Sequence, residues 1–306
     1  FRSLTSGPYF PVFRNGNSAN ISINFGQTGA FTFTPSGYNS LTVLNFADPT
    51  IPDPSAHFQT TLYTGNGSTQ SITQSGNSQF QPDWVWGKGR STAESHALFD
   101  AVRGTTKIIY SNLTNAEATN SGVTAFNSDG FSIGSSASLN NNTETYAAWQ
   151  WKANGSGSSN SDGSVSSTVS VNQTAGFSIV KWVHTTSANY TVGHGLGAVP
   201  KMVWVKTLDQ GTNWGVFHSD ITLGNRLILN STGAQTTGYW GANTFNSTVF
   251  SIGSARDANS SNAIGYVFAE VEGYSKISSY VGNGSTDGTF VFTGFKPAWV
   301  LLKRTN

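Results

Sequence analysis

The feature that most constrains this chain is an internal repeat. Residues 125–135 read AFNSDGFSIGS, and 119 residues later residues 244–254 read TFNSTVFSIGS. Residues 82–88 (PDWVWGK) return in the same order 118 residues later, at 200–206 (PKMVWVK). Because this period is about the size of a small independent domain and too long for a solenoid unit, the chain contains tandem copies of one domain type.

A third copy begins near the end of the sequence. Residues 280–285 (YVGNGS) echo residues 63–68 (YTGNGS). Residues 297–303 (PAWVLLK) then repeat the pattern of 82–88. The third copy stops shortly afterwards, so we expect it to be truncated.

These matches predict the domain organisation. Repeat 1 is expected at 58–153, repeat 2 at 173–273, and the start of a truncated repeat 3 at 274–306. Residues 47–57 are rich in proline and predict a semi-rigid linker. Residues 154–172 are rich in Gly, Ser and Asn, which favours a flexible linker or a long mobile loop.

The composition excludes several classes of protein. Charged residues are 10% of the chain, the net charge is +1, and no Lys/Arg cluster offers a nucleic-acid footprint. Aromatic residues reach 13%, with nine Trp, so a packed core is expected rather than disorder. The absence of cysteine excludes disulfides and thiolate metal sites. No apolar run approaches the length of about 18 residues that a membrane helix needs, so no membrane insertion is expected.

The apolar pattern predicts an all-β fold. Apolar residues alternate over short stretches, and Asn-Gly and Asp-Gly turn pairs separate them. Residues 84–86, 202–205 and 299–302 are almost continuously apolar, which is typical of strands that are covered on both faces or meet a neighbouring domain. We expect tandem antiparallel β-sandwiches, similar to lectin or jelly-roll domains. Their core includes Trp84, Trp86, Trp204 and Trp299.

The first residues resemble the end of a SPRY-type domain. Residues 7–12 (GPYFPV) match its closing Tyr-Phe-Pro strand, and residues 21–27 (ISINFGQ) match its Asn-Phe-Gly strand. The resemblance implies that residues 1–46 are the C-terminal part of a SPRY-like, lectin-type β-sandwich.

The repeats resemble a domain of structural proteins from marine and cyanobacterial phages, over about 57–306. The residues that carry this resemblance lie at 82–86, 95–104, 129–134, 146–152 and 266–274. It implies a place in the virion, in a tail fibre or similar appendage, and it brings no catalytic residues with it.

The sequence gives little support for a catalytic site, because acidic residues of repeat 1 are replaced in repeat 2. Asp100 and Asp129 of repeat 1 correspond to His218 and Thr248 of repeat 2, whereas a glycosidase usually needs two carboxylates. The five histidines show no clustering typical of a metal site. We therefore expect no enzyme activity, no cofactor and no metal. Arg103 is also replaced in repeat 2, which predicts that it is not needed for folding.

Three aromatic residues of repeat 2 are candidates for glycan binding. Tyr239 and Trp240 lie in a Gly-flanked segment that has no aromatic counterpart in repeat 1, and Trp214 replaces His96. Exposed aromatic rings beside Asn and Asp side chains suit the stacking of sugars. Local packing, or an interface with a neighbouring subunit, is the more common role for such residues.

Together these observations predict a non-enzymatic phage virion protein that serves host attachment as part of a tail fibre or appendage. Such proteins are symmetric assemblies, so we expect self-association, as a homotrimer, and contacts with other virion proteins. One alternative is a receptor-recognition module that binds host surface glycans. Another is a capsid decoration or head-fibre protein, which would move the chain from the tail to the head of the virion.

Overall fold

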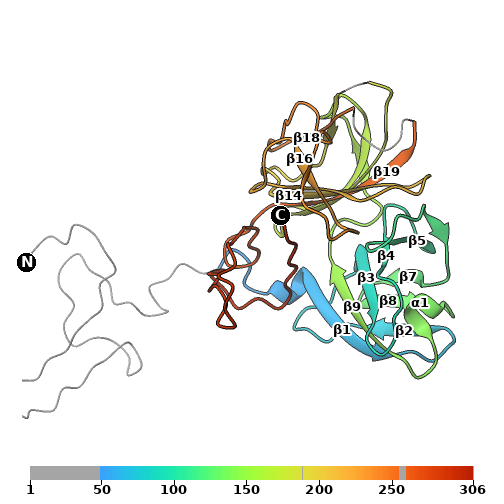
Figure 1. Cartoon of the computed structure of the whole chain (residues 1–306). Coiled ribbons are helices and arrows are strands. Elements are labelled where there is room, and N and C mark those ends of the chain that lie inside the picture. Colours follow the sequence, from blue (N-terminus) through green and yellow to red (C-terminus); the bar gives the residue numbers. More distant parts are fainter. Residues whose placement is uncertain (1–48, 188, 255–259, 306) are drawn as a thin grey trace, which may run out of the picture. The chain divides into compact units, whose positions relative to one another are not determined.

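The computed structural model describes residues 49–187, 189–254 and 260–305 (Figure 1). Residues 1–46, which we predicted to be the end of a SPRY-like domain, lie outside the described residues. The described chain is almost entirely β-structure, with antiparallel pairing between all adjacent strands, and the predicted all-β sandwich fold is confirmed. Within the described ranges, helix is limited to a 3-10 turn at Pro54–Ala56 and the short α1 at Ala137–Asn140.

Repeat 1 consists of two antiparallel sheets. The larger sheet has six strands in the order β1-β9-β3-β4-β5-β6, namely Phe58–Thr64, Thr145–Trp151, Trp84–Gly89, Ala97–Asp100, Lys107–Tyr110 and Ala118–Thr119. The smaller sheet has three strands in the order β2-β8-β7, namely Gln70–Thr73, Gly130–Ile133 and Val123–Asn127.

Repeat 2 has the same plan with an extended main sheet. Its eight strands run in the order β10-β11-β12-β19-β14-β15-β16-β17, namely Ser158–Asn160, Ser167–Asn172, Phe177–Val183, Asn262–Phe268, Met202–Thr207, Gly215–His218, Asn225–Ile228 and Thr236–Thr237. The second layer is the pair β13 and β18, at Tyr190–Gly193 and Val249–Ile252. From β12 to β17 the strand order is that of repeat 1 from β1 to β6, so the sequence repeat is also a repeat of topology.

Two of the three continuously apolar stretches, 84–86 and 202–205, are strands buried on both faces, because each main sheet lies between two cores. The third stretch, 299–302, forms no strand and is largely exposed, so that prediction is wrong. In β3, Val85 points into the core of repeat 1, whereas Trp84 and Trp86 point into a second core on the opposite face. In β14, Val203 belongs to the core of repeat 2 and Trp204 to that same second core. Since side chains alternate along a strand, one strand serves both cores, and the second core joins the two repeats.

Residues 154–172 differ from the flexible linker or long loop expected there. They contain β10 and β11, which pair with each other, and β11 also pairs with β12 along six residues. The stretch 168–172 (Thr-Val-Ser-Val-Asn) alternates polar residues with Val169 and Val171, and Val169 packs into the core of repeat 2. This alternation is a strand pattern, which the surrounding Gly and Ser residues obscured.

Residues 276–305 contain no strand, although their sequence echoes strands of repeat 1 (Figure 1, dark red). In repeat 1 the echoed strands β1 and β3 both pair with β9. The described part of the chain has no third strand of the β9 kind beside 276–305. Because a strand is stabilised only by pairing with a neighbour, this segment stays irregular.

Candidate functional site

The most distinctive site of the described chain is the joint between the two repeats. The six-stranded and eight-stranded sheets meet through an aromatic cluster, which we call the joint core. The ring of Trp84 stacks on Tyr266, with centroids 4.3 Å apart, and on Phe177 at 5.6 Å. Trp86 meets Trp204 edge-on at 5.7 Å. Aromatic pairs of this geometry each contribute about 0.5–1.5 kcal/mol beyond the area that they bury.

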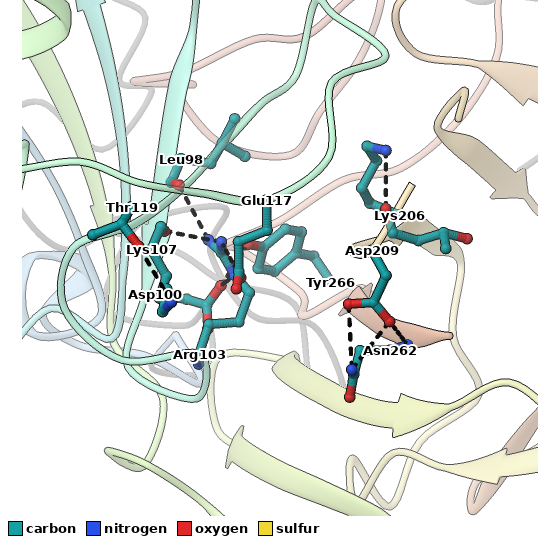
Figure 2. Close-up of polar contacts among 11 residues, drawn as sticks. Leu98, Asp100, Arg103, Lys107, Glu117, Thr119, Lys206, Asp209, Asn262 and Tyr266 are labelled. Carbon is teal, nitrogen blue, oxygen red and sulfur yellow. Dashed lines mark hydrogen bonds and ion pairs between the residues drawn. The ribbon is translucent and has the colours of Figure 1, made fainter. Parts of the chain in front are cut away.

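A buried polar network crosses the same joint (Figure 2). The Asp100 carboxylate at the end of β4 accepts hydrogen bonds from the Arg103 backbone N–H at 2.8 Å and from its Nε at 2.5 Å. The hydroxyl of Tyr266, in β19 of repeat 2, donates to the same carboxylate at 2.8 Å. The side chains of Asp100 and Arg103 are 0% and 1% exposed. The Tyr266 hydroxyl of repeat 2 is therefore hydrogen-bonded to a buried ion pair of repeat 1.

The guanidinium of Arg103 is held on all sides. It donates to the Lys107 carbonyl at 2.9 Å, to the Leu98 carbonyl at 3.1 Å and to the Glu117 carboxylate at 3.2 Å. Burial alone lowers the pKa of Arg103, but the neighbouring Asp100, Tyr266 and Glu117 raise it above its ordinary value. Arg103 therefore stays charged. The expectation that it plays no part in folding does not fit this network.

Two further hydrogen bonds join the repeats at the backbone. The indole Nε1 of Trp214 donates to the Tyr110 carbonyl at 2.8 Å, and the Glu117 N–H donates to the Leu208 carbonyl at 2.7 Å. These two hydrogen bonds thus directly connect residues that lie about 90 to 104 positions apart in the sequence. The joint combines apolar packing with specific polar contacts.

A buried lysine completes the joint. The Nζ of Lys206 is surrounded by oxygens of its own loop, and it also donates to the Thr114 carbonyl of repeat 1 at 3.2 Å. The loop oxygens are the Thr207 carbonyl at 2.9 Å, the Gln210 carbonyl at 3.3 Å and the Thr212 hydroxyl at 3.2 Å. In repeat 1 the equivalent Lys88 likewise donates to the carbonyl of the next residue, Gly89, at 2.7 Å.

The three predicted glycan-binding residues are buried. Trp214, Tyr239 and Trp240 are 0%, 1% and 0% exposed, so none presents a ring on which a sugar stacks, and this prediction is wrong. Trp214 belongs to the joint core, and the other two to the core of repeat 2. Trp240 packs edge-on against Phe217 with ring centroids 5.9 Å apart. The packing alternative is the correct interpretation of all three.

A polar hollow lies beside the segment that carries Tyr239 and Trp240. It has a volume of ≈ 370 Å³ and is lined by amide and hydroxyl side chains, by glycines and by Leu223, with no charged residue among those described. We call it the Asn-lined hollow, after Asn189, Asn225 and Asn243. The Oδ1 atom of Asn243 is buried and accepts no hydrogen bond from the described residues.

Neither a metal site nor a membrane-spanning helix is found among the described residues. Among them, no group of three His, Asp or Glu side chains is arranged to hold a metal ion. No helix in that part of the chain is both long and apolar enough to span a membrane.

His194 is buried, its Nε2 lies 3.0 Å from the Asn246 carbonyl, and its Nδ1 accepts the Leu196 N–H at 3.2 Å. Burial lowers the pKa of His194, so this ring is a neutral structural element.

The chain matches one protein family, described as Domain of unknown function (DUF7483), over residues 53–306. Because the match covers most of the sequence, the chain belongs to this family. No curated protein and no solved structure matches it.

Proposed function

We propose that this chain is a non-catalytic structural component of a virus particle, in which repeats 1 and 2 act as one stiff unit of a tail fibre or similar appendage. The observation that carries the proposal is the joint between the repeats. A protein that transmits force or sets a distance needs domains that do not swing on their linkers. The joint core and the Asp100–Arg103–Tyr266 network hold the two sandwiches against each other.

Further support comes from the sequence. The repeats resemble domains of phage structural proteins, and their low charge and uncharged polar residues suit a surface that faces the extracellular medium. An appendage of this kind self-associates and serves host attachment. A head-fibre or capsid-decoration role uses the same stiff unit at a different place on the particle.

The test is immunogold labelling of intact particles with an antibody against residues 49–306, combined with a copy number from quantitative mass spectrometry. Label on the tail supports an appendage that serves attachment. Label distributed over the capsid supports decoration. Particles that lack the chain altogether would contradict a structural role in the virion.

A second candidate function is recognition of a neutral carbohydrate at the Asn-lined hollow. Amide and hydroxyl groups both donate and accept hydrogen bonds, as sugar hydroxyls do, and an uncharged lining favours an uncharged ligand. The buried Oδ1 of Asn243 accepts no hydrogen bond from the described residues, so a ligand hydroxyl that reaches it would satisfy it. This proposal concerns different residues from the buried aromatic rings.

NMR titration of the isotopically labelled chain with glucose, galactose, mannose and N-acetylglucosamine tests this candidate. A sugar that binds should shift the amide signals of Asn189, Asn225 and Asn243, and the shifts should be lost in Asn243→Ala. The matched control is Asn142→Ala, an exposed asparagine of repeat 1. Shifts that are absent for all four sugars, or unchanged in Asn243→Ala, would remove the hollow from consideration.

A further inference from the structure

The largest group of exposed apolar side chains lies in residues 276–305, which we call the C-terminal segment. Phe290 and Val281 are both 86% exposed and Phe292 is 75% exposed. Several others of this segment are also exposed, namely Tyr280, Val291, Val300, Leu301 and Leu302. Contiguous exposed apolar surface of this kind marks interaction sites.

The C-terminal segment is held in place at both ends. Near its start, the Ile277 N–H donates to the Glu270 carboxylate at 2.8 Å. Near its end, Trp299 packs edge-on against Trp151 and Trp86 of the joint core, with ring centroids at 5.5 and 6.0 Å. The Thr305 carbonyl accepts the Gln235 N–H at 3.1 Å. The two ends of the segment are therefore anchored to the rest of the described chain, and the exposed side chains lie between or beside these anchors.

Within this segment, residues 289–293 have the sequence of a strand but pair with no other strand among the described residues. They read Thr-Phe-Val-Phe-Thr, residue types that favour β-structure. No backbone N–H or C=O of these five residues is hydrogen-bonded to another backbone group within the described chain. Such a row of free donors and acceptors is a template for β-strand addition.

The sequence of residues 289–293 reads the same in both directions. This symmetry indicates that the partner strand is the same segment of a second copy of the chain. Antiparallel pairing with the same residues of a second copy, about a twofold axis at Val291, places each Thr289 opposite Thr293 and each Phe290 opposite Phe292. Aromatic and Thr–Thr cross-strand pairs are favourable, and side-chain alternation brings the phenylalanines of both copies to one face. The contact is self-complementary, as a twofold interface requires.

The stretch around residues 289–293 lacks the charge that other common partners of an exposed surface need. The basic residues of the C-terminal segment lie outside this stretch, at Lys276, Lys296, Lys303 and Arg304. Between Ile277 and Phe295 the only charged residue is Asp287. A nucleic acid or an anionic membrane needs basic residues, and this stretch has none. An apolar, self-complementary strand fits a second copy of its own chain.

We propose that residues 289–293 join two copies of this chain by antiparallel strand pairing about a twofold axis. The proposal deepens the self-association included in the proposed function, and it assigns a twofold contact where the sequence led us to expect a homotrimer. Solution mass and particle labelling test the two proposals separately, since a virion protein can assemble through another surface.

Sedimentation and light scattering of the full chain give the first test. The expected species has about twice the 32.5 kDa mass of the chain. Phe290→Ser combined with Phe292→Ser should weaken its association about tenfold or more, whereas Leu223→Ser, which removes an exposed apolar residue elsewhere, should leave it unchanged. A monomer, a trimer, an aggregate of undefined size, or a dimer that survives the double substitution would overturn the proposal.

Cysteine cross-linking tests the register, because the chain contains no cysteine. Directly opposed residues of antiparallel strands have Cα atoms about 4.5–5.5 Å apart, within the range of about 4.4–6.8 Å that a disulfide allows. Val291→Cys should therefore form a covalent dimer under mild oxidation, and Val281→Cys should form far less, although Val281 is the more exposed of the two residues. Equal cross-linking of the two variants, or none at position 291, would contradict this pairing.

Discussion

Repeat 1 and repeat 2 share a strand order but differ where they meet. At the end of β4, repeat 1 has Asp100 and then Arg103, which are buried and bind Tyr266 of the other repeat. Repeat 2 has His218 and Ile221 at the equivalent positions, both half-buried, and His218 instead accepts the backbone N–H of Asp220. The copies are therefore specialised for their places in the array, and a residue that only one copy has can still be essential to the pair.

A second difference lies inside the two sandwiches. In repeat 1, a Cβ added to Gly122 would lie 2.3 Å from the Phe99 ring, so glycine is needed there. In repeat 2, Phe217, the equivalent of Phe99, packs against Trp240 and stacks on Phe245. The same fold thus accommodates a glycine in one core and a tryptophan in the other, because the connecting segments are shaped differently.

Breaking the Asp100–Arg103 ion pair should give the largest difference in stability between equivalent substitutions in the two repeats. Arg103→Met leaves the Asp100 carboxylate buried without its partner, and we expect the free energy of unfolding to fall by about 3–5 kcal/mol. Ile221→Met, the equivalent change in repeat 2, should cost less than about 1.5 kcal/mol. Urea unfolding followed by circular dichroism measures both. Similar losses in the two variants would mean that the network is not special to repeat 1.

Removing the hydroxyl that crosses the joint should have the next largest effect. Tyr266→Phe keeps the aromatic packing but deletes the hydrogen bond to the charged Asp100, which should cost about 1.5–3 kcal/mol. The matched change Tyr190→Phe removes a hydroxyl within the core of repeat 2. Only Tyr266→Phe should separate the unfolding of the two repeats into distinct steps, and a single step in both variants would argue against a crossing role for Tyr266.

The tryptophans of the joint core allow a smaller, sharper comparison. Trp214→Phe leaves the Tyr110 carbonyl without its indole donor, at a cost of about 1–3 kcal/mol for the lost bond and the smaller ring. The Nε1 of Trp84 has no hydrogen-bond partner among the described residues, so Trp84→Phe loses ring area alone. Thermal unfolding should show the larger loss for Trp214→Phe, and the reverse order would contradict this assignment.

In alkali, the stability of the chain should fall because of its buried tyrosines. Burial raises the pKa of Tyr266 well above its ordinary value of 10.0, and burial also raises the pKa of Tyr63 and Tyr274. The unfolded chain therefore releases these protons first, so above about pH 10 the free energy of unfolding falls by about 1.4 kcal/mol per pH unit for each tyrosine. Unfolding between pH 8 and 11 should show a shallower decline in Tyr266→Phe than in the wild type.

The sequence predicts much of this architecture, because periodicity and repetition are local signals. Residues 84–86 and 202–205 indicated strands covered on both faces, and their alternation between two cores confirms it. The joint itself was less predictable, since Asp100 and Tyr266 are 166 positions apart in the sequence. A composition rich in Gly and Ser also hid β11. Tyr239 and Trp240 looked exposed because glycines flank them, yet burial is set by neighbours that the local sequence does not reveal.

The central claim is that the two repeats form one stiff unit, and amide hydrogen exchange of the full chain tests it most directly. Mass spectrometry should find that the central strands β3 and β9 of repeat 1 exchange with the same free energy of opening as β14 and β19 of repeat 2. Arg103→Met should then lower both values together. Strands of one repeat that remain protected while those of the other exchange freely would show that the repeats unfold independently, and would contradict the account.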